Sequence, residues 1–184
     1  FVIGAAVSGA ELSEHKLLRK NLPGLVEAAN LIGYWWGYKM RYEAPTTSRD
    51  AAAILAKSKE TAFVLGGGTD VLVKMRTGLI EPDLLVDIKA IPAMKEIKVS
   101  DKGFVIGAAV SGAELSEHKL LRKHLPGLVE AANLIGSDQI QGRCTLAGNL
   151  CNASPAADSV PAMIAVGAKA CLLYTSDAAD EYSG

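Results

Sequence analysis

Two stretches of small residues in this sequence carry groups that could bind a phosphate. The first is Gly66-Gly67-Gly68-Thr69-Asp70, which stands between two apolar runs. Glycine has no Cβ, so backbone N–H groups can converge on an anion, and the helix expected next adds the positive end of its dipole. Val71 occupies the last glycine position of a dinucleotide-binding Gly-x-Gly-x-x-Gly loop, and the Gly-Lys-Ser/Thr of a Walker loop is missing. An ordinary tight turn is the alternative interpretation.

The second stretch runs from Thr145 to Ser159 and is nearly uncharged. Ser154-Pro155 fits the N-cap and first position of a helix, and Asp158 or Ser159 could cap the next turn. The side-chain amides of Asn149 and Asn152 add further donors. An ordinary capped loop would explain this stretch alone, but two such stretches in one small domain favour a diphosphate held from both sides.

The composition limits the class of protein. The 184 residues, 49% hydrophobic and 21% charged, fit one domain or two small lobes that share a core. The net charge of −1 argues against a protein that binds nucleic acid through its phosphates. We expect no membrane span, because the apolar runs are short, and no leader peptide, because no basic-then-apolar segment with a small-residue cleavage site opens the chain. The three cysteines form no Cys-x-x-Cys pair, so we predict a reducing, cytoplasmic location.

A near-identical repeat divides the chain. Residues 1–33 recur as residues 104–136, with 32 of 33 positions identical. A structural repeat keeps its apolar pattern rather than its surface residues, so this identity favours an artefact of cloning or assembly over a recent duplication. Residues 171–184 resemble a translated sequencing adapter. We therefore predict a duplicate with an aromatic linker at 1–39, the domain at 40–170 and a foreign tail at 171–184.

Local signals place helices and strands around both stretches. Thr47 with Asp50 predicts a helix start, and Ser111 with Glu114 predicts a capping box. Short apolar runs predict buried strands, and the run from Ser100 to Gly103 predicts a hairpin turn. The expected helices are 51–59, 71–75, 111–123, 128–135 after a break at Pro126-Gly127, and 137–141; the expected strands are 62–65, 83–88, 96–99 and 104–108. Because these elements mix without strict alternation, we predict an α+β fold.

Both stretches resemble signatures of one family, the FAD-binding subunit of molybdenum hydroxylases. This family includes the medium subunit of aerobic carbon monoxide dehydrogenase and the flavin domain of xanthine dehydrogenase. Gly66 to Asp70 looks like its opening diphosphate loop, and Thr145 to Asp158 resembles its Thr-x-Gly-Gly-Asn-x-x-x-Ala-Ser-Pro-x-x-Asp signature. The resemblance covers residues 40 to about 170. It implies a two-lobed FAD-binding domain of the molybdopterin-dehydrogenase (PCMH-like) type, incomplete at its C-terminus.

The resemblance also implies which residues bind FAD. Asp158 matches a family acidic position that contacts FAD, and Ile135 falls where a family side chain lies against the cofactor. Ala147 departs from the family, which most often has glycine there, and its methyl group could crowd the phosphate. The residues of the two implied loops are Val64, Leu65, Gly66, Gly67, Gly68, Thr69, Asp70 and Val71, and Thr145, Leu146, Ala147, Gly148 and Asn149.

By resemblance, the chain is an oxidoreductase subunit that relays electrons. They would come from a molybdopterin-binding subunit through an iron–sulfur subunit to FAD, and leave to an acceptor such as NAD or a quinone. The alternative is a non-catalytic fragment that binds a phosphate-bearing ligand, or nothing.

The sequence offers no catalytic acid–base pair and no metal site. A flavin stores the electrons itself, so a protein of this kind need only bind, orient and tune it. His118 and His124 lie six residues apart without further ligands at a metal-binding spacing. Cys144 and Cys151 flank the second stretch, and we predict that both are buried small side chains.

Overall fold

The computed structural model of the chain describes residues 15–22, 40–59 and 61–173. The chain divides into two units, Phe1–Lys39 and Met40–Gly184. In the first unit, α2 (Lys16–Asn21) begins after His15, whose Nδ1 accepts a hydrogen bond from the Leu18 N–H at 3.4 Å. The other residues of the predicted duplicate and its linker, and residues 174–184 of the predicted tail, lie outside the described residues.

A three-stranded parallel sheet begins the larger unit. Its strand order is β1-β3-β2, with β1 at Arg41–Glu43, β2 at Ala62–Leu65 and β3 at Leu84–Asp87. Every residue of β3 is buried, as expected of the central strand of a parallel sheet. Because β2 and β3 run in parallel and Leu65 pairs with Asp87, the carboxyl ends of these strands lie side by side.

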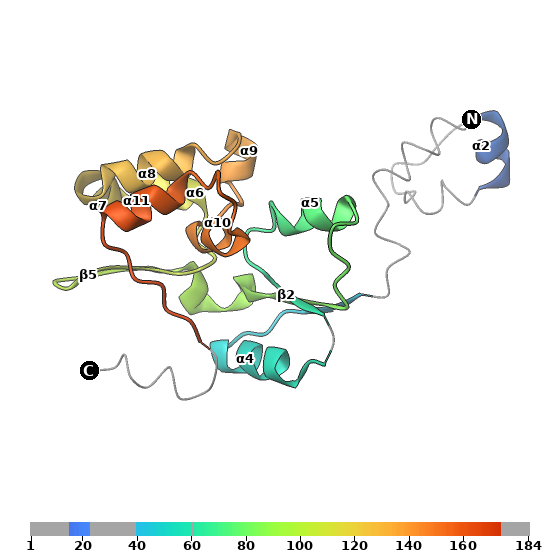
Figure 1. The fold of residues 1–184 in the computed structure, drawn as a ribbon, viewed down its shortest axis with the longest axis horizontal. Helices are drawn as coiled ribbons and strands as arrows, with labels where there is room; N and C mark the ends of the chain where they lie inside the picture. Colours follow the sequence, from blue (N-terminus) through green and yellow to red (C-terminus); the bar gives the residue numbers. More distant parts are fainter. Residues whose placement is uncertain (1–14, 23–39, 60, 174–184) are drawn as a thin grey trace. The chain divides into compact units, whose positions relative to one another are not determined.

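Helices lie on both sides of this sheet (Figure 1). The helix α4 (Ser48–Lys57) begins after Thr47, whose Oγ1 accepts a hydrogen bond from the Asp50 N–H at 3.1 Å, as predicted. Its buried Ala51 packs in a core with Leu84 and Val86 of β3. The helix α5 (Val71–Arg76) follows the glycine stretch, and two 3-10 turns, η2 (Ile88–Ala90) and η3 (Pro92–Lys95), follow β3.

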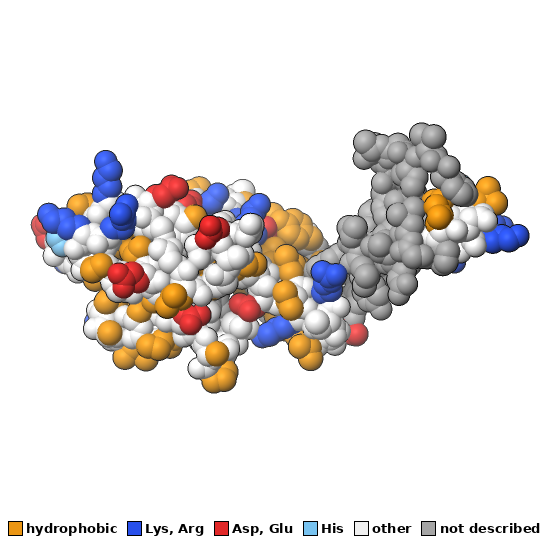
Figure 2. Space-filling view, turned by 90° about the horizontal axis from the view of Figure 1, so that it is seen from above, with side chains coloured by type: hydrophobic (Ala, Val, Ile, Leu, Met, Phe, Trp, Pro, Cys, Tyr) orange, Lys and Arg blue, Asp and Glu red, His pale blue; other side chains and the backbone are white. Residues whose placement is uncertain are grey.

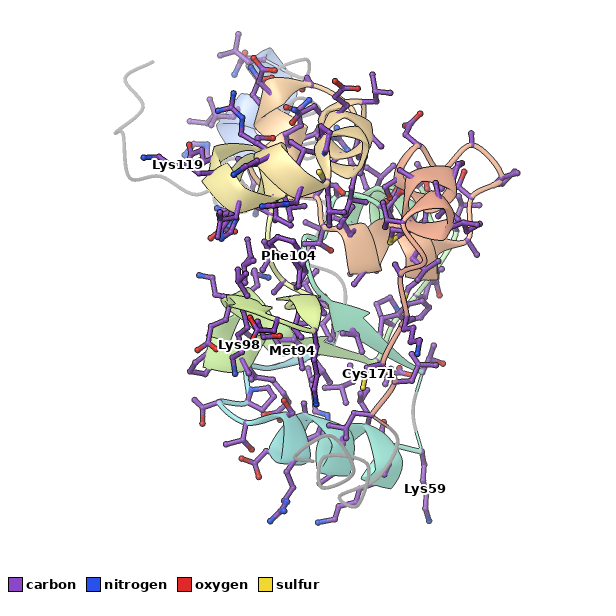
Figure 3. All side chains as sticks on the ribbon, turned by 90° about the vertical axis from the view of Figure 1, so that its left-hand side faces the viewer. Lys59, Met94, Lys98, Phe104, Lys119 and Cys171 are labelled. Carbon is purple, nitrogen blue, oxygen red and sulfur yellow. The ribbon has the colours of Figure 1, made fainter. Side chains whose placement is uncertain are left out.

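An antiparallel hairpin joins the sheet to a group of helices. Its strands are β4 (Ile97–Ser100) and β5 (Gly103–Ile106), and Ser100 pairs with Gly103 across the predicted turn. Phe104 of β5 packs against the helical core, and its ring lies edge-on to that of His118, with 6.4 Å between centroids. Figure 3 shows Phe104 between the hairpin and the helices.

The helical group has its own apolar core. Its helices are α6 (Gly112–Glu117), α7 (Lys119–His124), α8 (Pro126–Asn133), α9 (Asp138–Gln141), α10 (Leu146–Asn152) and α11 (Ser159–Ala165). The buried core residues are Val110, Leu115, Leu121, Leu128, Val129, Ala132 and Leu146. The unit is thus mixed helix and sheet, as the predicted α+β class requires.

The prediction of a single helix over 111–123 is wrong, because the helix is interrupted at His118. This residue has φ −74° and ψ 105°, and its Nδ1 accepts a hydrogen bond from the Leu121 N–H at 3.2 Å. His118 thereby caps a second helix, α7, whose buried face is rotated relative to that of α6. Leu115 of α6 and Leu121 of α7 are both buried as a result. The predicted break between the next two helices is present, but it lies at Leu125, and Pro126 is the first residue of α8, where proline needs no N–H partner.

The second stretch of small residues also differs from expectation. Residues predicted as a loop form α10, because Thr145 caps the helix by accepting a hydrogen bond from the Gly148 N–H at 2.9 Å. The helix ends at Ala153, a non-glycine residue in the left-handed region with φ 54°. Ser154-Pro155 then lies in a turn rather than at a helix start, and α11 begins after Asp158.

The capping box of α6 predicts a contribution to stability that is lost in acid. Hydrogen bonds from the Ser111 backbone and hydroxyl lower the pKa of Glu114. A folded pKa below the unfolded one stabilises the fold above the unfolded value, and this contribution is lost as the pH falls through the folded pKa. We expect Glu114→Gln to narrow the difference in urea unfolding midpoint between about pH 7 and about pH 3.

The control variant is Glu117→Gln, the same chemical change at an exposed position on the same helix. It should leave the pH difference as in the unaltered chain. Equal narrowing in both variants would contradict a specific role of Glu114.

Candidate functional site

A cavity of about 310 Å³ lies in the larger unit, next to both stretches of small residues. Its size is at the lower end of the range for small-molecule sites, about 300–1,000 Å³. It is lined by Thr69 and Asp70 before α5, by Ile135 and Gly136 between α8 and α9, by Ile140 of α9, and by Asn149, Asn152, Ser154, Ala156 and Asp158 from α10 to α11. Hydroxyl and amide groups can donate to and accept from a ligand, and the two carboxylates can accept from its hydroxyl groups.

Five of the residues predicted from the sequence line this cavity. They come from three separate segments: Thr69, Asp70, Ile135, Asn149 and Asp158. The structure therefore brings both predicted motifs and the isolated Ile135 to one place. The remaining predicted residues lie in the adjoining elements and do not line the cavity: Val64, Leu65, Gly66, Gly67, Gly68, Val71, Thr145, Leu146, Ala147 and Gly148.

Asn152 also lines the cavity, and the sequence predicted its amide as a further donor. Ser154 was predicted only as a helix cap, and its hydroxyl was the signal that could have placed it among the ligand groups. Gly136, Ile140 and Ala156 carried no such signal, because their place at the cavity depends on how α8, α9 and α10 pack.

The glycine stretch lies against the backbone just before α10. A Cβ on Gly67 would stand 2.0 Å from the carbonyl oxygen of Arg143 and 3.0 Å from the Cα of Cys144. Gly68 has φ +83°, a conformation that favours glycine. The sequence predicted that these glycines make room for an anion. The structure shows a further reason for glycine at position 67, since it lets two backbone segments touch.

Hydrogen bonds fix the second stretch. The Ser159 hydroxyl is fully buried and donates to Asn149 Oδ1 at 2.6 Å, which orients the Asn149 amide at the cavity. Thr145 is buried as well, and its cap closes the first turn of α10. A Cβ on Gly148 would come within 2.8 Å of Thr145 Oγ1, so glycine suits that turn.

Polar contacts also connect the two motifs with each other. Lys74 of α5 donates from Nζ to Asn152 Oδ1 of α10. The Gly112 N–H donates to the Cys144 carbonyl at 2.9 Å, which ties the start of α6 to the segment that touches Gly67. The Lys74 bond thus connects the two sides of the cavity, whereas the Gly112 bond fixes the second stretch within the helical group.

The cysteines and the surface add two observations. Cys144 is buried, and burial raises the pKa of its thiol, whereas Cys151 is exposed, so the predicted burial of Cys151 is wrong. Among residues 15–22, 40–59 and 61–173, no three His, Cys, Asp or Glu side chains gather as a metal site would require, and no helix has the length and apolar character to cross a bilayer. Figure 2 shows basic, acidic and hydrophobic side chains interspersed on one face of the described larger unit.

Comparison with known proteins gives a consistent result. A family model described as "FAD binding domain in molybdopterin dehydrogenase" matches residues 38–181. The chain is 33% identical over 121 residues to the nicotinate dehydrogenase FAD-subunit of Eubacterium barkeri, covering 65% of this chain and 41% of the relative. It is 33% identical over 129 residues to the xanthine dehydrogenase FAD-binding subunit of Escherichia coli O157:H7, covering 70% and 44%.

A solved structure shares the fold. Reconstituted CO dehydrogenase from Oligotropha carboxidovorans has a TM-score of 0.63 and 33% identity to this chain, and the match covers 65% of this chain and 42% of that one. The chain therefore spans less than half the length of these relatives.

The close backbone approach at Gly67 predicts a position-specific loss of stability. We expect Gly67→Ala to lower the free energy of unfolding by roughly 1–3 kcal/mol, the usual range for overpacking, because the Arg143 carbonyl must move. Gly66→Ala is the matched control, since its Cβ would meet atoms no nearer than 3.6 Å and should be tolerated. Urea unfolding of both variants measures the difference. Equal stability of the two would contradict the contact.

Proposed function

The chain belongs to the family of FAD binding domains in molybdopterin dehydrogenases, and we propose that it holds FAD at the cavity between α5 and α10. The predicted family, the α+β class and FAD as the family's cofactor are confirmed by these comparisons. The placement of FAD on particular residues is our proposal. It rests above all on one observation: Thr69 of the first motif and Asn149 and Asp158 of the second line the same cavity.

The residues present suit parts of an FAD molecule. Among the described residues, no acceptor takes a hydrogen bond from the N–H groups of Gly67, Gly68 or Thr69, so these donors are available to phosphate oxygens. The Asn149 amide and the Thr69 hydroxyl add further polar groups. The carboxylates of Asp70 and Asp158 would repel phosphate and are better suited to hydroxyl groups. A cavity of about 310 Å³ holds part of an extended cofactor, with the rest lying along the glycine stretch.

We propose that the chain serves as the FAD-binding subunit of a molybdenum-containing oxidoreductase. FAD, when bound, supplies the electron storage that such a relay needs. The chain's own residues bind and orient it: the backbone at Gly66–Thr69, the oriented Asn149 amide and the Asp158 carboxylate. The proposed partners are an iron–sulfur subunit and a molybdopterin-binding subunit, which would supply the electrons, and the proposed acceptor is NAD or a quinone. A cytoplasmic location is consistent with the free cysteines Cys144, Cys151 and Cys171.

The second candidate is a non-catalytic chain that binds another phosphate-bearing ligand at the same cavity, or nothing; the polar groups of Thr69 and Asn149 would suit any phosphate-bearing ligand. FAD binding by the full chain separates the two proposals.

FAD binding predicts a saturable flavin complex and a raised melting temperature, since a ligand stabilises the state it binds. We expect Asp158→Asn to weaken FAD about tenfold, because hydrogen bonds to a charged group contribute more than neutral ones. Asp101→Asn, the same change in the exposed β4–β5 turn, should bind FAD as the unaltered chain does. Fluorescence titration of the full chain measures both. Absence of a flavin complex in a chain that melts cooperatively would contradict the proposal.

The relay proposal makes a separate prediction about the acceptor. Electron transfer to NAD is reversible, so NADH should reduce the bound flavin under anaerobic conditions if NAD is the acceptor; a quinol should do so if the acceptor is a quinone. Stopped-flow absorbance of the flavin measures either reaction. A flavin that dithionite reduces but neither donor does would contradict both acceptors.

A further inference from the structure

A chain of polar contacts lies beside the first glycine of the loop, at the carboxyl ends of β2 and β3. Asp87, the last residue of β3, is only 6% exposed and carries a carboxylate there. Its Oδ2 accepts a hydrogen bond from the Tyr42 hydroxyl at 2.5 Å, and its Oδ1 accepts one from the Lys89 backbone N–H at 2.8 Å. The Lys89 ammonium lies 2.9 Å from Oδ2. A buried charge is thus compensated on several sides, as burial requires.

The pKa directions agree with this arrangement. Burial raises the pKa of Asp87, but the hydrogen bonds from Tyr42 and Lys89 and the charge of Lys89 outweigh it and lower the pKa below its ordinary value. The hydrogen bond to Asp87 raises the pKa of Tyr42. Asp87 is therefore charged and Tyr42 is a neutral donor at neutral pH.

Lys89 is oriented by this carboxylate toward the glycine loop. Its side chain is 29% exposed, and its Nζ donates to the Gly66 carbonyl at 3.1 Å. The peptide unit between Gly66 and Gly67 is planar and trans, so the Gly66 carbonyl and the Gly67 N–H point in opposite directions. Holding the carbonyl toward Lys89 therefore turns the Gly67 N–H away from it. No acceptor among the described residues takes that N–H.

We propose that Lys89 is a positioning residue for the cofactor: held by Asp87 and Tyr42, it fixes the Gly66–Gly67 peptide so that the Gly67 N–H faces the FAD diphosphate. This inference rests on the proposed function. Lys89 acts through the peptide and need not touch the cofactor. The contact is set by the pairing of β2 with β3, which brings Gly66 and Lys89 together although they lie 23 residues apart in the sequence.

The test is an FAD titration of the full 184-residue chain and four variants, well below their melting temperatures. Lys89→Met keeps most of the side-chain length but removes the donor, and we expect it to weaken FAD about tenfold. Lys89→Arg keeps the charge and donors and should stay within about threefold of the unaltered chain. Lys98→Met is the matched control, because it removes the same charge from a different place. Lys98 lies on the hairpin, and its side chain is 66% exposed (Figure 3). It should bind FAD unchanged.

Tyr42→Phe tests the same role of Lys89 if Lys89→Met does not fold. Tyr42→Phe removes one hydroxyl from an exposed ring, and it should weaken FAD about threefold by loosening Asp87. A purely structural role would lower the melting temperature of the variants without changing the FAD affinity of the folded chain.

The outcomes separate this inference from the proposed function. Weakened FAD binding in Lys89→Met with rescue by Lys89→Arg supports it, and if Lys89→Met fails to fold, weakened binding in Tyr42→Phe supports it. The inference alone would be overturned if the unaltered chain forms a saturable FAD complex and the folded variant, Lys89→Met or Tyr42→Phe, binds FAD with the same affinity. Absence of an FAD complex in the folded, unaltered chain would overturn the proposed function and this inference with it.

Discussion

The approach of one backbone to another at Gly67 is the constraint on which the rest of the site depends. The sheet and the helical group have separate apolar cores, one around β3 and one around α8. The predicted ligand groups are divided between them. At Gly67 the glycine stretch comes into close backbone contact with Arg143, just before the second motif. Any side chain at that position would push the glycine stretch and the start of α10 apart, and the cavity they share would change shape.

The contacts around this approach are polar and directional. Lys74 bonds to Asn152, the Gly112 N–H bonds to the Cys144 carbonyl, and Lys89 bonds to the Gly66 carbonyl. Apolar packing is proportional to area and tolerates small displacements, whereas a hydrogen bond weakens steeply when its geometry is lost. The bond between Lys74 and Asn152 therefore fixes the position of α5 relative to α10, while the other two bonds fix the start of α10 and the glycine stretch, each against its own neighbours.

The sequence predicted the features that depend on neighbouring residues and missed those that depend on packing. Thr47 and Ser111 predict helix starts because the residues that they bond to, Asp50 and Glu114, lie three positions away in the sequence. Both caps are present in the structure. The break at His118 could not be predicted in this way, because histidine is an unusual cap and the break serves to bury Leu121. Of the candidate site, both motifs and Ile135 could be identified, whereas Ile140 and Ala156 reach the cavity only through the packing of short helices. The contact between Lys89 and Gly66 follows from strand order, which no local pattern encodes.

The lengths of the helices decide what kind of binding the site can support. The sequence suggested that helix dipoles would help to hold a phosphate, but α5 has six residues and α10 has seven. A helix of fewer than two turns aligns few peptide dipoles, and the side chains that line the cavity include no Lys or Arg. Charge compensation inside the cavity is therefore weak, and attraction for a phosphate must come from individual N–H donors at short range. Such donors work only if their peptides are held in one orientation, which is the task of glycine at 67 and 68 and of the carbonyl contact at Gly66. This is why the first motif consists of consecutive glycines, Gly66 to Gly68, rather than of positively charged residues.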